Sequence, residues 1–165
     1  MKFSKKATGI SPSLTLGIDT LAKEMKAQGK DVISFGVGEP DFDTPQYIKE
    51  AAKAAIDRGC TKYTPVPGIM ELRQAISDRY KEVYGLDYGA TGVVVSNGAK
   101  QSLYNTFQAI LDPGDEVIII APYWVTYPEL VKMASGKPVI VEAREEDDFQ
   151  PRIEAIAQAV TPHTR

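Results

Sequence analysis

Apolar residues recur at helical spacing in six segments of the chain, separated by polar and turn-forming residues. The first segment covers 16–25, and Gly29 follows it in the position where a left-handed residue commonly ends a helix. The second follows Thr44, which we expect to cap it, with Pro45 at the first helical position and Gly59 after the last turn. The other predicted helices cover 69–83, 99–111, 126–134 and 151–160.

Four short apolar runs are typical of β-strands. Val32–Phe35 and Gly92–Val95 are flanked by loops, and Glu116–Ile120 lacks polar alternation, as expected for a strand covered on both faces. The fourth run is Pro138–Val141. Strands and helices alternate from residue 91 onward, so right-handed crossovers and a largely parallel sheet are expected. The predicted fold class is therefore α/β.

Composition narrows the function classes. The 165 residues are 43% hydrophobic and 25% charged, which suits one globular domain with a hydrophobic core. The net charge of -3, with basic residues spread along the chain, argues against nucleic-acid binding. The apolar run 117–121 is far shorter than a spanning helix, and Gly9 and Pro12 interrupt any secretory leader. Because the single cysteine, Cys60, excludes an intramolecular disulfide and fits a reducing compartment, we predict a cytoplasmic protein that contacts no membrane.

Residues 95–101, with the sequence VSNGAKQ, join a predicted strand to a predicted helix. Backbone N–H groups and the helix dipole converge in front of such a junction, and Gly98 permits close approach. Ser96 and Lys100 add a hydroxyl and a cation, so the segment suits an anion such as phosphate, although the P-loop spacing is absent. A tight turn followed by a solvated lysine fits the same residues equally well.

Other polar and aromatic positions carry weaker signals. Gly36–Gly38 resembles the beginning of a dinucleotide fingerprint, but Asp41 replaces the third glycine, which argues against NAD binding. Trp124 follows an apolar strand at the carboxyl edge of the predicted sheet, where it could pack in the core or stack on a planar cofactor. His163 has no companions for a metal cluster or a catalytic triad, and Cys60 is read as an inert thiol. No metal site is predicted.

Four separated motifs bring these signals together. They are Gly38–Phe42, Lys62–Pro65, Ser96–Gln101 and Ala121–Val125. In order and spacing they resemble the N-terminal part of bacterial class I aminotransferases, specifically the aspartate aminotransferases, over almost the whole chain. The resemblance implies fold type I of the pyridoxal-phosphate enzymes, here as an incomplete large domain with a mainly parallel sheet and flanking helices. Residues 1–45 are then an N-terminal arm, irregular over 1–14, with part of the small domain, and 46–165 are the first part of the large cofactor-binding domain.

The same resemblance implies an activity. The complete enzyme would use pyridoxal 5'-phosphate to transfer an amino group between L-aspartate and 2-oxoglutarate, as a homodimer with active sites at the subunit interface. The Schiff-base lysine of the family lies beyond Arg165, so the chain is read as a truncated fragment, inactive alone and without a catalytic residue. Two alternatives remain: another pyridoxal-phosphate enzyme of this fold, such as an aromatic aminotransferase or a lyase, or a non-catalytic module that binds a phosphate ligand or dimerises.

Cofactor contacts follow from the resemblance by position. Gly98, Ala99 and Lys100 would line the cradle for the cofactor phosphate. Trp124 would stack on the pyridine ring. Tyr63 would reach across the dimer interface to the phosphate of the partner's cofactor.

Substrate contacts are implied in the same way. Gly38 would approach the α-carboxylate through its backbone, and Trp124 would contact the substrate. Lys100 would meet the distal carboxylate of a dicarboxylic substrate. Ser13 and Thr15 would lie near the substrate mouth.

Overall fold

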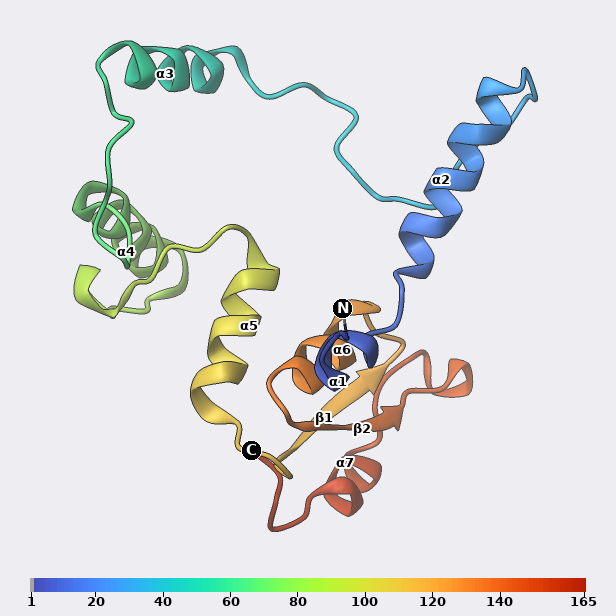
Figure 1. Ribbon diagram of the computed structural model, residues 1–165. Coiled ribbons are helices and arrows are strands. Elements are labelled where there is room, and N and C mark those ends of the chain that lie inside the picture. Colours follow the sequence, from blue (N-terminus) through green and yellow to red (C-terminus); the bar gives the residue numbers. More distant parts are fainter. Residues whose placement is uncertain (1) are drawn as a thin grey trace. The chain divides into compact units, whose positions relative to one another are not determined.

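The computed structural model describes residues 2–165 as two compact units, shown in Figure 1. The strand unit comprises the residues up to Val37 together with Gly98–Arg165, and the helical unit comprises Gly38–Asn97. The domain boundary predicted at residue 45 concerns the complete family fold and stays a prediction. Within residues 2–165, none of the helices has the length and apolar character needed to cross a membrane.

A pair of parallel strands forms the centre of the strand unit. β1 (Glu116–Ala121) pairs with β2 (Lys137–Glu142) along its whole length. On the other edge of β1, Thr164 forms an isolated parallel bridge to Glu116. Both strands match the sequence prediction, and their parallel pairing confirms the α/β class.

Two helices cover the strand pair. α6 (Thr126–Met133) follows β1 and contacts both strands, and α7 (Ile153–Ala159) follows β2 and contacts that strand. The chain passes from β1 through α6 to β2, and then from β2 through α7 back across β1 to Thr164, so the two connections run in opposite directions across the sheet. Right-handed connections that run in opposite directions put their helices on opposite faces, as Figure 1 shows for α6 and α7. α5 (Ala99–Ile110) packs on α6. The core contains Leu111, Ile119, Val131 and Ala134, with Phe107, Val117 and Tyr123 packed against it.

All six predicted helices are present, with ends close to those expected. The remaining three are α2 (Leu14–Ala27), α3 (Gln46–Asp57) and α4 (Met70–Tyr84). Gly29 and Gly59 follow α2 and α3 with φ of 78° and 77°, which confirms the predicted ends. Two 3-10 turns complete the elements, η1 (Ala90–Gly92) and η2 (Glu145–Asp147).

Two predictions are wrong, one about the arm over 1–14 and one about the residue that caps α3. The arm over 1–14 is not wholly irregular, because Lys5–Thr8 form α1, whose first turn is capped where Ser4 Oγ accepts the Ala7 N–H at 3.1 Å. Thr44 does not cap α3. Pro45 holds the cap position in an extended conformation (φ -51°, ψ 141°) and makes no side-chain cap bond.

Two predicted strands are absent among the described residues, because neither has a partner strand. Val32–Phe35 forms neither a helix nor a strand. In the second segment η1 occupies Ala90–Gly92, and the residues after it bond elsewhere: Val95 N–H donates to the Pro67 carbonyl at 2.9 Å. An apolar run becomes a strand only where a neighbour completes its hydrogen bonds.

Candidate functional site

Helix α5 begins with an open N-terminus at Gly98. This glycine has φ 79° and ψ 169°, and its carbonyl accepts the N–H groups of Gln101 (3.2 Å) and Ser102 (3.3 Å). Helix geometry then leaves the N–H groups of Ala99 and Lys100 without an intrahelical acceptor. The cap residue, Gly98, has no side chain that could cap this turn, and the first turn holds no acidic residue. The free donors and the positive end of the helix dipole suit an anion.

The side chain of Lys100 lies over Trp124. Its Nζ is 5.5 Å from the centroid of the indole ring. Trp124 lies in the loop between β1 and α6 and is 45% exposed, so the aromatic surface is available to a ligand. A cation over an exposed ring contributes about 0.5–1 kcal/mol. The structure therefore brings together two predicted site residues that come from different motifs.

Ser13 and Thr15 begin helix α2. Ser13 is the N-cap, and its Oγ accepts the Leu16 N–H at 3.4 Å. Thr15 is half-buried in the first turn. Ser13 therefore already has a structural role in addition to the substrate contact that the sequence suggests.

The arm before α2 is tied to α6 by one carboxylate. Glu129 Oε2 accepts the Ser11 N–H at 3.2 Å, and Glu129 Oε1 accepts a hydrogen bond from Lys132 Nζ at 2.9 Å. Burial alone would raise the pKa of Glu129, but the Lys132 ammonium and the Ser11 N–H hold it below its usual value. A cavity of about 580 Å³ lies between the arm and α6, with Ser13 and Tyr123 in its wall.

Gly38 and Tyr63, the predicted site residues of the helical unit, have open surroundings. Tyr63 is completely exposed, and Gly38 has no atom within 4 Å of the position that a Cβ would occupy. Their predicted roles therefore stay predictions. As for metal ions, no group of three or more potential ligand side chains occurs within residues 2–165.

Arg73 is a buried charged residue that none of the sequence patterns above singles out. It is 8% exposed on α4, and its Nε donates to the Val93 carbonyl oxygen at 2.9 Å. The available signal is its place in the apolar stripe of the predicted helix, four residues after Ile69 and three before Ile76.

Known proteins provide an independent comparison. The profile of the family described as aminotransferase class I and II matches residues 30–165. The chain is similar to an aspartate aminotransferase of Geobacillus stearothermophilus, with 50% identity over 165 residues that make up 100% of this chain. It is also similar to an aspartate/prephenate aminotransferase of Thermus thermophilus, with 46% identity over 162 residues, or 98% of the chain. The chain spans 42% of the length of each of these relatives.

A comparison with solved structures leads to the same family. The aspartate aminotransferase from Thermus thermophilus with maleate matches with a TM-score of 0.96 and 45% sequence identity. The match covers 100% of this chain and 43% of that one. The predicted resemblance and the predicted fold type are confirmed by these matches.

Proposed function

The chain belongs to the family of class I and II aminotransferases, and from that premise we propose that it forms part of a pyridoxal-phosphate-dependent aspartate aminotransferase. In the complete protein the amino group would pass between L-aspartate and 2-oxoglutarate. The observation that carries this proposal is the uncapped N-terminus of α5 beside the Lys100–Trp124 contact.

The residues at this end of α5 fit the cofactor phosphate. Gly98 leaves open space in front of the turn, since a Cβ built there would meet nothing within 4 Å. The N–H groups of Ala99 and Lys100 would hold the phosphate oxygens, helped by the helix dipole. Bound pyridoxal phosphate supplies an electron-withdrawing ring for chemistry at the substrate's α-carbon. The exposed face of Trp124 would pack against that ring.

Lys100 can serve both predicted roles because they use different atoms. Its backbone N–H belongs to the phosphate cradle, whereas its Nζ, held over Trp124, would pair with the distal carboxylate of a dicarboxylic substrate. The Thermus thermophilus relative that contains maleate, a dicarboxylate, supports this choice of substrate class.

The remaining predicted contacts complete the proposal. Gly38 would meet the α-carboxylate through its backbone, and Ser13 and Thr15 would lie near the substrate mouth. The exposure of Tyr63 suits a side chain that reaches the cofactor phosphate of a second subunit in a homodimer. The single free cysteine, Cys60, suits a cytoplasmic protein.

Cofactor binding by the 165-residue chain tests the phosphate cradle. We expect pyridoxal phosphate to bind weakly in equilibrium dialysis and to be displaced by inorganic phosphate. Replacing Lys100 with methionine keeps the backbone N–H but removes a positive charge from the first turn of the phosphate-binding helix, so it should weaken this binding by about threefold, as expected for a screened charge attraction. The matched control is Lys53→Met, on the exposed face of α3. Equal loss in both variants, or binding that phosphate does not compete, would contradict the proposal.

Catalysis by the same chain is tested separately. We expect no transamination of aspartate, because the resemblance places the Schiff-base lysine outside these 165 residues. Borohydride reduction followed by peptide mass spectrometry should give scattered, substoichiometric labelling of lysines. Cofactor-dependent turnover, or a stoichiometric adduct on one lysine, would contradict this expectation.

A further inference from the structure

Two segments that carry predicted cofactor motifs meet inside the helical unit. One is the loop 61–68, which contains Tyr63, and the other is the run that leads from Val93 into Ser96 and Asn97. The Val95 N–H donates to the carbonyl oxygen of Pro67 at 2.9 Å.

Close approach between these segments requires a glycine. Gly68 has φ 103°, and a Cβ at this position would lie 2.7 Å from Val95 Cγ2. Such a separation is far below a van der Waals contact, so any larger residue would push the segments apart. The same Cβ position is 3.9 Å from Arg73 Cγ, which puts the stem of Arg73 beside the meeting point.

The head of Arg73 fixes the second segment. Its Nε donates to the Val93 carbonyl oxygen at 2.9 Å, and the residue is 8% exposed. Within residues 2–165 no carboxylate forms an ion pair with this guanidinium. A buried cation is costly unless hydrogen bonds satisfy it, so the bond to Val93 holds the backbone in a fixed place.

We propose that Arg73 is a positioning residue for the cofactor-binding turn. From α4 it contacts the loop 61–68 with its stem and the 93–95 run with its Nε, and thereby fixes the backbone that leads into Ser96 and Asn97. It touches neither the cofactor nor the substrate. Its effect on cofactor affinity rests on the proposed function, whereas its effect on the two segments does not.

Hydrogen exchange measured by mass spectrometry on the 165-residue chain tests the mechanical part of the proposal. Arg73→Met keeps an unbranched apolar stem and removes the donor. We expect amides in 93–97 and the amide of Gly68 to exchange about tenfold faster, while amides of 76–84 in α4 change less than about twofold. Arg73→Lys keeps a cation and a donor and should restore part of the protection.

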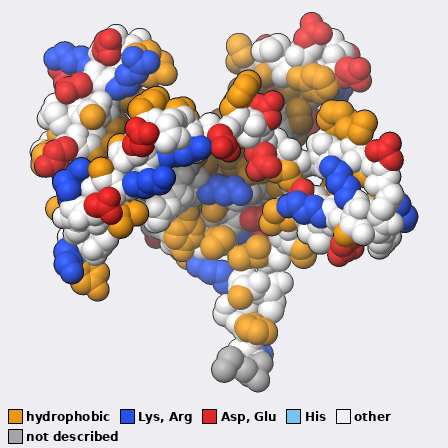
Figure 2. Space-filling view, turned by 90° about the horizontal axis from the view of Figure 1, so that it is seen from above, with side chains coloured by type: hydrophobic (Ala, Val, Ile, Leu, Met, Phe, Trp, Pro, Cys, Tyr) orange, Lys and Arg blue, Asp and Glu red, His pale blue; other side chains and the backbone are white. Residues whose placement is uncertain are grey.

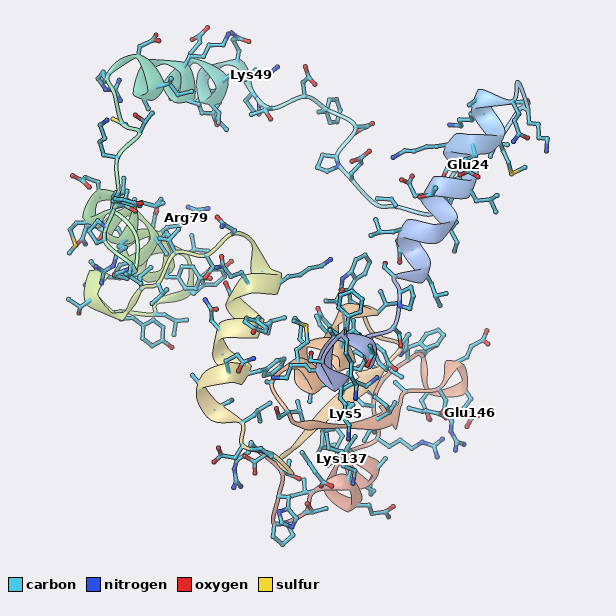
Figure 3. The ribbon with its side chains drawn as sticks, in the orientation of Figure 1. Lys5, Glu24, Lys49, Arg79, Lys137 and Glu146 are labelled. Atoms are coloured by element: carbon cyan, nitrogen blue, oxygen red, sulfur yellow. The ribbon has the colours of Figure 1, made fainter. Side chains whose placement is uncertain are left out.

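The control is Arg79→Met on the same helix. Arg79 is exposed, with Nη1 3.5 Å from Glu82 Oε2, and Figure 3 labels it on α4. This variant should leave exchange in 93–97 unchanged. Equal acceleration of α4 and 93–97 in Arg73→Met, or none in 93–97, overturns the proposal.

Pyridoxal phosphate affinity is the second readout. Arg73→Met should weaken it about tenfold, Arg73→Lys should recover part of the loss, and Arg79→Met should have no effect. If Arg73→Met speeds exchange in 93–97 but leaves the affinity for pyridoxal phosphate unchanged, the proposed effect of Arg73 on cofactor binding is overturned. If the unsubstituted chain binds no pyridoxal phosphate, the proposed function fails, and the exchange experiment still decides whether Arg73 positions the segments.

Discussion

Gly98 holds a backbone conformation, φ 79° and ψ 169°, that is open to glycine and strained for other residues. Replacing it with alanine should lower the free energy of unfolding by about 1–3 kcal/mol and weaken phosphate binding, even though the space around it is empty. Urea denaturation measures the first effect and equilibrium dialysis the second.

The matched control is Gly17→Ala in α2. Gly17 also has nothing within 4 Å of a Cβ, but it lies inside a helix without a positive φ. Alanine there should raise the free energy of unfolding by about 0.5–1 kcal/mol. If the two variants change stability in the same direction, backbone strain at Gly98 is not the cause.

Single residues were predictable where the chemistry is local. Gly98, Ala99 and Lys100 stand at a helix start that can be predicted from the sequence alone, and α5 begins there as expected, although the strand predicted before it is absent among residues 2–165. The contact between Lys100 and Trp124 joins residues 24 positions apart, and only the resemblance assigned both to one site. Arg73 escaped notice because an arginine on an amphipathic helix usually lies in solvent.

The end of the chain is joined to β1 through a carboxylate. Lys137 Nζ donates to Glu116 Oε1 at 2.8 Å, and Thr161 Oγ1 donates to Glu116 Oε2 at 2.6 Å; Figure 3 labels Lys137 at the start of β2. These hydrogen bonds, with a smaller effect of His163, hold the pKa of Glu116 below its usual value. The contribution of these Glu116 hydrogen bonds to the free energy of unfolding therefore depends on pH, in the direction that the lowered pKa determines.

Acid should weaken this connection. The unfolded chain has a glutamate pKa of about 4.3, above the folded value, so the unfolded state binds more protons in this window and stability rises with pH through it. The contribution is complete above about pH 5 and is lost as the pH falls through the lowered pKa. Urea midpoints measured from about pH 7 to pH 3 should therefore fall less in Glu116→Gln than in the unsubstituted chain.

Glu24→Gln is the matched control for this comparison, since Glu24 is an exposed residue of α2, where Figure 3 labels it. Its urea midpoints should follow those of the unsubstituted chain at every pH. A Glu116→Gln profile parallel to both would show that Glu116 does not titrate with unfolding.

Helices were easier to predict than strands for a physical reason. The periodicity and end signals of a helix lie within its own residues, and all six expected helices are present. A strand depends on a neighbour far away in sequence. Two of the predicted strands, Glu116–Ile120 and Pro138–Val141, pair with each other and are separated in the sequence by a single helix. The other two, Val32–Phe35 and Gly92–Val95, have no partner strand among residues 2–165.

The whole chain leaves apolar surface and sheet edges uncovered. Figure 2 shows hydrophobic side chains spread over the visible face among the charged ones, and exposed examples include Phe35, Phe42 and Val66. Among the described residues, the outer edge of β2 has no partner strand. Such an edge is a template for pairing with another chain. The division of the chain into two units could not be predicted from local sequence patterns, because it depends on contacts between residues far apart in the sequence.

We therefore expect the 165-residue chain to self-associate as its concentration rises in sedimentation velocity. Ile140→Lys puts a charge at an exposed position of β2 and should move association to about tenfold higher concentration, equivalent to about 1.4 kcal/mol. Ile153→Lys, at a 78% exposed position on α7, is the control outside the strands themselves. A chain that stays monomeric, or variants that associate alike, would contradict pairing at this edge.

The contact between Lys100 and Trp124 also gives the protein an optical reporter. Trp124 is the single tryptophan, so emission excited beyond the absorption of tyrosine comes from the candidate site alone. Its half-exposed indole responds to the polarity and charge of whatever lies beside it. A pyridoxal ring stacked on it would quench the emission by energy transfer. The occupancy of the site can therefore be followed by fluorescence without any label.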